Sequence, residues 1–150
     1  MKPRLYLCLA LLAFLAADAP QDPSPSDLEL LQGTWVLESG ERDGKKVPDD
    51  QLGKATVVSK GNKYKITAGI GTATRGTFTI DPDKSPKWLD ATAAAGPDKG
   101  KTWLGIYTVD GTTHRACLAP PGQPRPEKFA SPADSGVIDE TWTKQQKKQK

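Results

Sequence analysis

The chain of 150 residues has little of what most catalytic and metal-binding sites need: it contains two cysteines, one methionine and one histidine, His114. A metal site with two or more histidine ligands is therefore excluded, and a Ser-His-Asp triad would have to use His114. No Gly-x-Ser-x-Gly motif supplies a nucleophilic serine. We therefore expect a protein that is not an enzyme and that carries no metal and no cofactor.

Long hydrophobic runs are also missing, so we expect no transmembrane helix. The one apolar segment, residues 5–17, follows Lys2 and Arg4 and ends in small residues. This is the plan of a secretory signal peptide, which we expect over residues 1–19, with cleavage near Ala17. The protein should then be exported to the periplasm, the cell surface or the medium; an uncleaved anchor is the alternative.

Removal of the signal would leave Cys117 as the only cysteine, so no intramolecular disulfide can form. Because Cys117 lies beside Leu118 in a predicted strand, we expect a small buried apolar residue. An intermolecular disulfide and a reactive thiol are the alternatives.

The charges do not gather on a predicted folded segment. Four lysines lie at the C-terminal end, and without them and the signal the chain has slightly more acidic than basic residues. Nucleic-acid binding is therefore not expected. Residues 145–150 should form a disordered basic tail, with at most weak contact to an anionic membrane surface through Lys144, Lys147, Lys148 and Lys150.

The chain does have many short segments of alternating apolar and polar residues, separated by turns rich in its 14 glycines and 13 prolines. About eight such segments follow one another without helical crossovers, which predicts an all-β fold: a small antiparallel up-and-down barrel. A two-sheet sandwich is the alternative. Residues 20–27 read as an extended linker, and the barrel domain should span residues 28–144. A capping box from Ser26 to Glu29 predicts a short helix before the first strand.

Residues 100–118 predict a long β-hairpin at the centre of this fold. The pair Asp110-Gly111 favours a two-residue type I′ turn, in which Val109 would face Thr112. Tyr107 would then face His114, and the two would form a polar pair on an apolar inner face.

A barrel of eight strands is either filled by side chains or just wide enough for one small ligand. Several predicted inward positions are small, which favours a cavity: Ala55, Ser59, Gly76, Ala91, Gly105 and Ala116. The side chains expected to contact a ligand are aromatic or polar: Trp35, Tyr64, Phe78, Trp103, Tyr107 and His114.

Three ordered blocks of sequence carry a resemblance: Leu31-Gln32-Gly33-Thr34-Trp35, then Gly96-Pro97-Asp98-Lys99-Gly100-Lys101-Thr102 with Leu104-Gly105-Ile106-Tyr107, and finally Cys117-Leu118-Ala119-Pro120-Pro121-Gly122. Together they resemble an uncharacterised lipocalin-like (calycin-like) domain family that is abundant in planctomycete bacteria. The resemblance covers residues 28–144 and implies a lipocalin-like barrel in an exported protein, with no established ligand or activity. Gly33-x-Trp35 is also similar to the first-strand signature of true lipocalins, where the Trp packs across the barrel floor. Lys144 stands where a closing arginine would be sought.

Two other motifs predict only turns. Gly100-Lys101-Thr102 resembles the end of a phosphate-binding loop, but Ala95 replaces the required glycine and a strand is expected to follow instead of a helix. The acidic pairs beside prolines lack the spaced ligands of a calcium loop and should be solvated turn residues: Asp49 with Asp50, and Asp81 with Asp83.

Two functions remain open from the sequence. The first is an exported, non-enzymatic barrel that binds a small apolar or amphipathic molecule, for which a cavity of roughly 300 Å³ or more is expected. The second is a structural or interaction module of the cell envelope, with a filled barrel and a protein partner on the loops 81–87 and 119–132.

Overall fold

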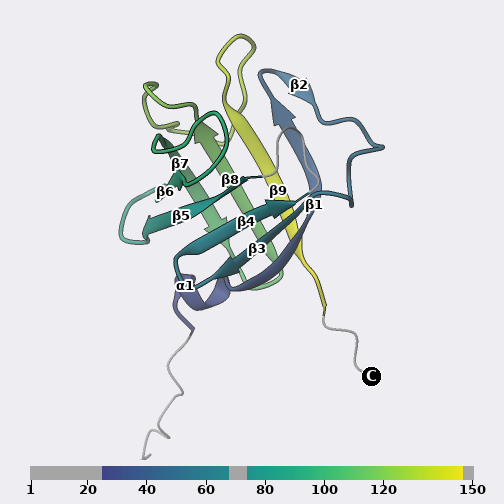
Figure 1. Ribbon diagram of the computed structural model, residues 1–150, viewed down its shortest axis with the longest axis vertical. Helices are drawn as coiled ribbons and strands as arrows, with labels where there is room; N and C mark the ends of the chain where they lie inside the picture. The colour runs from purple at the N-terminus through teal and green to yellow at the C-terminus, as the bar shows by residue number, and fades with distance from the viewer. Residues whose placement is uncertain (1–24, 68–73, 147–150) are drawn as a thin grey trace, which may run out of the picture.

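The computed structural model describes residues 25–67 and 74–146, and within them nearly all regular structure is β-strand (Figure 1). The predicted signal (residues 1–19), most of the linker (residues 20–27) and Lys147, Lys148 and Lys150 lie outside this part. The elements follow in chain order: α1 (Asp27–Leu30), β1 (Gly33–Arg42), β2 (Lys45–Lys46), β3 (Thr56–Lys60), β4 (Lys63–Thr67), β5 (Thr74–Asp81), β6 (Lys87–Ala93), β7 (Thr102–Val109), β8 (Thr113–Ala119) and β9 (Ile138–Lys144).

Eight of the strands form a closed antiparallel barrel. Each strand from β3 to β8 pairs with the next one along the chain, β1 pairs with β3, and β1 also pairs with β9. The short β2 extends one end of β1 as a hairpin. The expected up-and-down barrel is thus confirmed, and the two-sheet sandwich is wrong because the β1–β9 pairing leaves no open edge between two sheets.

The central hairpin keeps the predicted faces but not the predicted register. Val109 pairs with His114, and Tyr107 pairs with Ala116, so the expected Tyr107–His114 pair is wrong. Gly111 has a positive φ (+92°) and Asp110 does not, which rules out a type I′ turn at these two residues. Asp110 instead accepts hydrogen bonds from the backbone N–H groups of Thr112 and Thr113, as an Asx turn does. The shift of two residues leaves every side chain on its predicted face.

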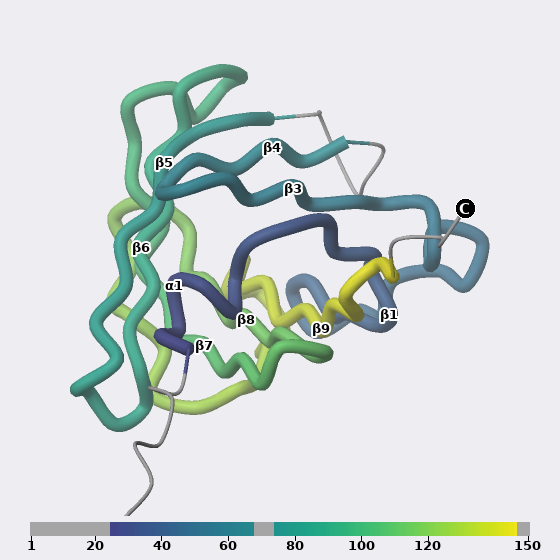
Figure 2. Tube along the Cα trace, turned by 90° about the horizontal axis from the view of Figure 1, so that it is seen from below, coloured from purple at the N-terminus to yellow at the C-terminus, as the bar shows by residue number. Residues whose placement is uncertain are grey.

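Helix α1 closes one end of the barrel. Its capping box is present, with Ser26 and Glu29 bonded reciprocally, although the helix is a single turn. Seen from below, α1 lies at one side of the ring of strands, beside β6 and β7, and the chain after it runs on to β1 (Figure 2). Leu31, which follows the helix, is buried against Phe78 and Tyr107. The chain entering the first strand is therefore the floor of the barrel.

A long segment between β8 and β9, residues 120–137, covers part of the outer surface; we call it the strap. Arg125 of the strap forms an ion pair with Asp90 of β6, and Cys117 of β8 is fully buried with its thiol near the carbonyl of Ala130 (3.4 Å). Burial also raises the pKa of this thiol. The prediction of a buried Cys117 is confirmed, and the strap accounts for that burial.

Candidate functional site

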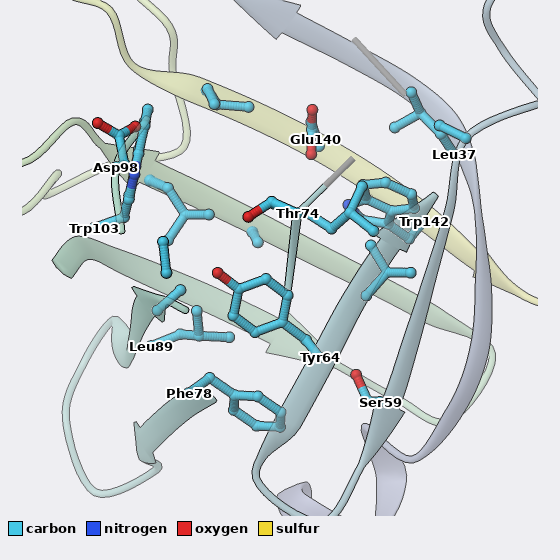
Figure 3. A pocket seen from close by; sticks show the side chains of 18 of the residues that line it. Leu37, Ser59, Tyr64, Thr74, Phe78, Leu89, Asp98, Trp103, Glu140 and Trp142 are labelled. Atoms are coloured by element: carbon cyan, nitrogen blue, oxygen red, sulfur yellow. The ribbon is translucent and has the colours of Figure 1, made fainter. Parts of the chain in front are cut away.

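A cavity of about 400 Å³ lies inside the barrel. Leu31 of the floor and Arg42, at the other end of β1, both line it. Thr74 and the β6–β7 loop, which includes Asp98, line it as well (Figure 3). The cavity therefore extends from the floor formed by α1 to the other end of the barrel. Its volume lies within the range of about 300–1,000 Å³ that is usual for small-molecule sites.

Small side chains at mid-barrel make this space. The predicted inward positions Ala55, Ser59, Ala91 and Ala116 all line the cavity. The same alternation that places Tyr64 and Phe78 on the inner face places these short side chains beside them. Because short side chains fill less of an eight-stranded barrel than Leu or Phe would, the interior is only partly occupied.

Gly105, another predicted inward position, has a different role. A Cβ atom there would lie 2.5 Å from Leu118 Cδ2 and 2.6 Å from the carbonyl oxygen of Cys117. The glycine therefore allows the side chain of Leu118 and the backbone of β8 to approach β7 closely. Gly76 likewise allows a close approach, here by the side chain of Tyr64. A Cβ atom at Gly76 would lie 2.8 Å from the hydroxyl oxygen of Tyr64.

Four of the six predicted ligand contacts line the cavity: Tyr64, Phe78, Trp103 and His114. They come from β4, β5, β7 and β8, so the barrel brings together residues that are far apart in the sequence. Figure 3 shows Tyr64 and Phe78 on one side of the space and Trp103 near its far end.

Trp35 and Tyr107 are not among the lining residues; both are buried in the floor. The indole N–H of Trp35 donates to the carbonyl oxygen of Leu31 (2.9 Å). The hydroxyl of Tyr107 donates to a carboxylate oxygen of Asp27 (2.7 Å). The same oxygen forms an ion pair with the ammonium group of Lys87 (2.7 Å). These two aromatic residues hold the N-terminal segment against the barrel, a role that the sequence did not indicate.

His114 lies against the edge of the Trp35 ring, with ring centroids 5.5 Å apart. Its Nε2 atom is inaccessible and has no hydrogen-bond partner within the described part of the chain. Burial lowers the pKa of His114 to about 4. The imidazole is therefore neutral at physiological pH, and its Nε2 atom is a polar group beside an apolar space that no described residue bonds.

Glu140 of β9 is a lining residue that the sequence analysis missed. Its carboxyl group points into the cavity in Figure 3, and burial raises its pKa to about 7, although the charge of Arg42 acts in the opposite direction. No hydrogen bond or ion pair joins the carboxyl group to another residue in ranges 25–67 and 74–146. The alternation of β9 could have found it, since Ile138, Glu140 and Trp142 share one face.

Two other polar residues that line the cavity have partners within the protein. The hydroxyl of Thr74 donates to the carbonyl of Ala95 (3.2 Å), and Asp98 forms an ion pair with Lys101 (3.5 Å). Strand β7 begins at Thr102, directly after Gly100-Lys101. Among the residues that the structure describes, no three His, Cys, Asp or Glu side chains are grouped to hold a metal ion, and no helix is long and apolar enough to cross a membrane.

The geometry thus defines an eight-stranded antiparallel barrel with an internal cavity, a closed floor and two buried titratable side chains on its inner face. Comparisons of the chain with protein-family models, with curated proteins and with solved structures find no match. A function for this chain must therefore be argued from its own residues.

Proposed function

We propose that this protein is an exported, non-enzymatic, lipocalin-like barrel that binds a small apolar or amphipathic molecule in its interior. One observation carries the proposal: the barrel encloses about 400 Å³ between apolar and aromatic walls. Binding sites for small molecules combine such walls with a few polar groups that orient the ligand. Glu140 and His114 are polar groups of this kind.

The floor of the barrel supports the lipocalin-like part of the proposal. Trp35 of the Gly33-x-Trp35 block is buried there, as the resemblance to lipocalins implies. The ammonium group of Lys144 lies 5.0 Å from the centroid of the Trp35 ring and donates to the carbonyl of Leu30 (2.9 Å). Lys144, which stands where a closing arginine would be sought, thus joins the last strand to the Trp of the first strand.

Export and surface contact are separate parts of the proposal. Export rests on the signal-like residues 1–19 and is tested by expressing the full chain and determining the N-terminal residue of the protein recovered outside the cytoplasm. A start near residue 20 is expected, and an intact Met1 would contradict export through a cleaved signal. The ammonium group of Lys144 is bonded at the floor of the barrel. Any weak contact with an anionic membrane surface would therefore be made by Lys147, Lys148 and Lys150.

The ligand-binding part is tested by the melting temperature and Trp emission of the purified protein with a panel of fatty acids, isoprenoids and aromatic metabolites. Trp103 and Trp142 line the cavity and should report an occupant. Ala91→Leu fills the cavity and should weaken binding, whereas Thr77→Leu on the exposed outer face of β5 is the matched control. If no compound raises the melting temperature and Ala91→Leu is as stable as wild type, the interior binds nothing and the protein-partner alternative on loops 81–87 and 119–132 takes its place.

A further inference from the structure

The most unusual group in the barrel is the carboxyl of Glu140. It lies in the middle of β9, directly opposite Gly40 of β1 and Ala116 of β8, so neither of the two residues paired with it has a polar side chain. A buried carboxylate without a partner is unfavourable, and a protein normally pairs such a charge or keeps it protonated. Because Glu140 faces the cavity and no residue in the described ranges bonds its carboxyl group, the cavity is where a partner can reach it.

The charged and titratable groups around Glu140 are few. Arg42 lies on β1 two residues beyond Gly40, away from the floor, and also lines the cavity. Its positive charge favours the ionised carboxylate of Glu140. Asp139 precedes Glu140 on the outer face, where Arg115 neutralises it. His114 lies two residues from Ala116 on β8 and is neutral. Across the cavity are the hydroxyl of Tyr64 and, near the far end, Asp98.

The walls of the cavity that Glu140 faces carry several aromatic rings. Tyr64, Phe78, Trp103 and Trp142 all line the same cavity. Aromatic faces attract cations, and they do so most strongly where water is excluded. A carboxylate in a cavity with aromatic walls therefore suits a positively charged group attached to an apolar body.

We propose that the ligand of this cavity is an amphipathic amine, whose ammonium group pairs with Glu140 and whose apolar part fills the space between the aromatic walls. This inference rests on the proposed function, because it names the class of molecule that the cavity binds. The ammonium group gives the carboxylate of Glu140 a charge-assisted hydrogen bond, which no residue in the described part of the chain supplies.

The pairing makes binding depend on pH in a defined direction. Glu140 is half protonated near pH 7 in the free protein and must ionise to pair with an ammonium group. Amine affinity should therefore rise about tenfold per pH unit below 7 and level off above it. At pH 6 binding should release about one proton per ligand, and at pH 8.5 almost none. His114, with its pKa near 4, does not titrate in this range.

The experiment measures binding of decylamine, decan-1-ol and decanoic acid to the purified protein by titration calorimetry from pH 5.5 to 8.5. At pH 8 decylamine should bind about 10- to 100-fold more tightly than decanol, because it adds a charge-assisted hydrogen bond. The affinity for decanol should not vary with pH. The affinity for decanoate should fall as Glu140 ionises.

Glu140→Gln keeps the shape of the side chain and should remove both the preference for the amine and its pH dependence. Asp98→Asn is the matched control, since Asp98 is the other lining carboxylate but is paired with Lys101. If decanol or decanoate binds and decylamine binds no more tightly, or if Glu140→Gln leaves amine binding unchanged, the inference is overturned while the proposed function stands. If none of the three compounds binds, both are overturned.

Discussion

Two buried titratable groups on the inner face should shift stability in opposite directions as the pH changes. Burial raises the pKa of Glu140 from 4.5 to about 7 and lowers that of His114 from 6.5 to about 4. Between pH 4.5 and 7 the folded state holds a proton on Glu140 that the unfolded state has lost, so Glu140 makes stability fall as pH rises. Between pH 4 and 6.5 the unfolded state holds a proton on His114 that the folded state lacks, so His114 makes stability rise with pH.

The two effects have similar size. One pKa unit corresponds to about 1.4 kcal/mol, so each group changes the free energy of unfolding by up to about 3 kcal/mol across its range. From pH 4.5 to 6.5 the slopes oppose each other, and the wild-type profile should be nearly flat. His114→Leu should leave a profile that falls as pH rises, and Glu140→Gln should leave one that rises. The variant with both substitutions should be flat again.

The measurement is urea unfolding of the four proteins at half-unit steps from pH 4.5 to 7.5, followed by Trp fluorescence. Differences between variants are compared at each pH, so that contributions common to all four proteins cancel. His114→Leu should also be about 1–3 kcal/mol more stable than wild type at pH 5, because it removes a buried nitrogen without a partner. Parallel profiles for wild type and both single variants would refute the assignment of these two groups as the buried titrating pair.

Three further predictions concern the frame of the barrel. Asp27→Ala should destabilise the protein by about 1–3 kcal/mol, and a double-mutant cycle with Tyr107→Phe should show coupling of the two side chains; additive losses would contradict the floor contact. Gly105→Ala should cost about 1–3 kcal/mol in urea unfolding because its Cβ meets Leu118; a wild-type midpoint would show that β7 and β8 can separate freely. The Cys117 thiol should react slowly with a thiol reagent in the native protein and quickly in urea; equal rates would mean that the strap does not protect it.

Much of the barrel could be predicted because strand alternation is a local signal. Ala55, Tyr64 and Phe78 could be placed on the inner face from their spacing alone, and the closed barrel follows from antiparallel segments in sequence. The register of paired strands is harder to predict, because it depends on the conformation that each turn adopts. At Asp110 the side chain bonds the backbone of the next residues, and that bond outweighs the turn preference of an Asp-Gly pair. The same pair at Asp43-Gly44 does adopt two positive φ values, as a type I′ turn requires.

The floor and the strap could not be predicted because their contacts join residues far apart in the chain. The hydroxyl of Tyr107 reaches Asp27, and Lys144 reaches Leu30, across 80 and 114 residues. An inward aromatic residue can line a cavity or seal its end, and only the path of the N-terminal segment decides which. Tyr64 and Tyr107 both face inward, yet only Tyr107 meets an acidic partner.

Glu140 links stability and function in this barrel. With its pKa near 7, the side chain destabilises the ligand-free barrel most above neutral pH, where the carboxyl is charged and no described residue forms an ion pair with it. Glu140→Gln should therefore make the empty protein more stable at pH 8 while weakening amine binding. A group that served only the fold would lose stability on the same substitution. Opposite changes in stability and affinity from one substitution are the signature of a residue whose partner is the ligand.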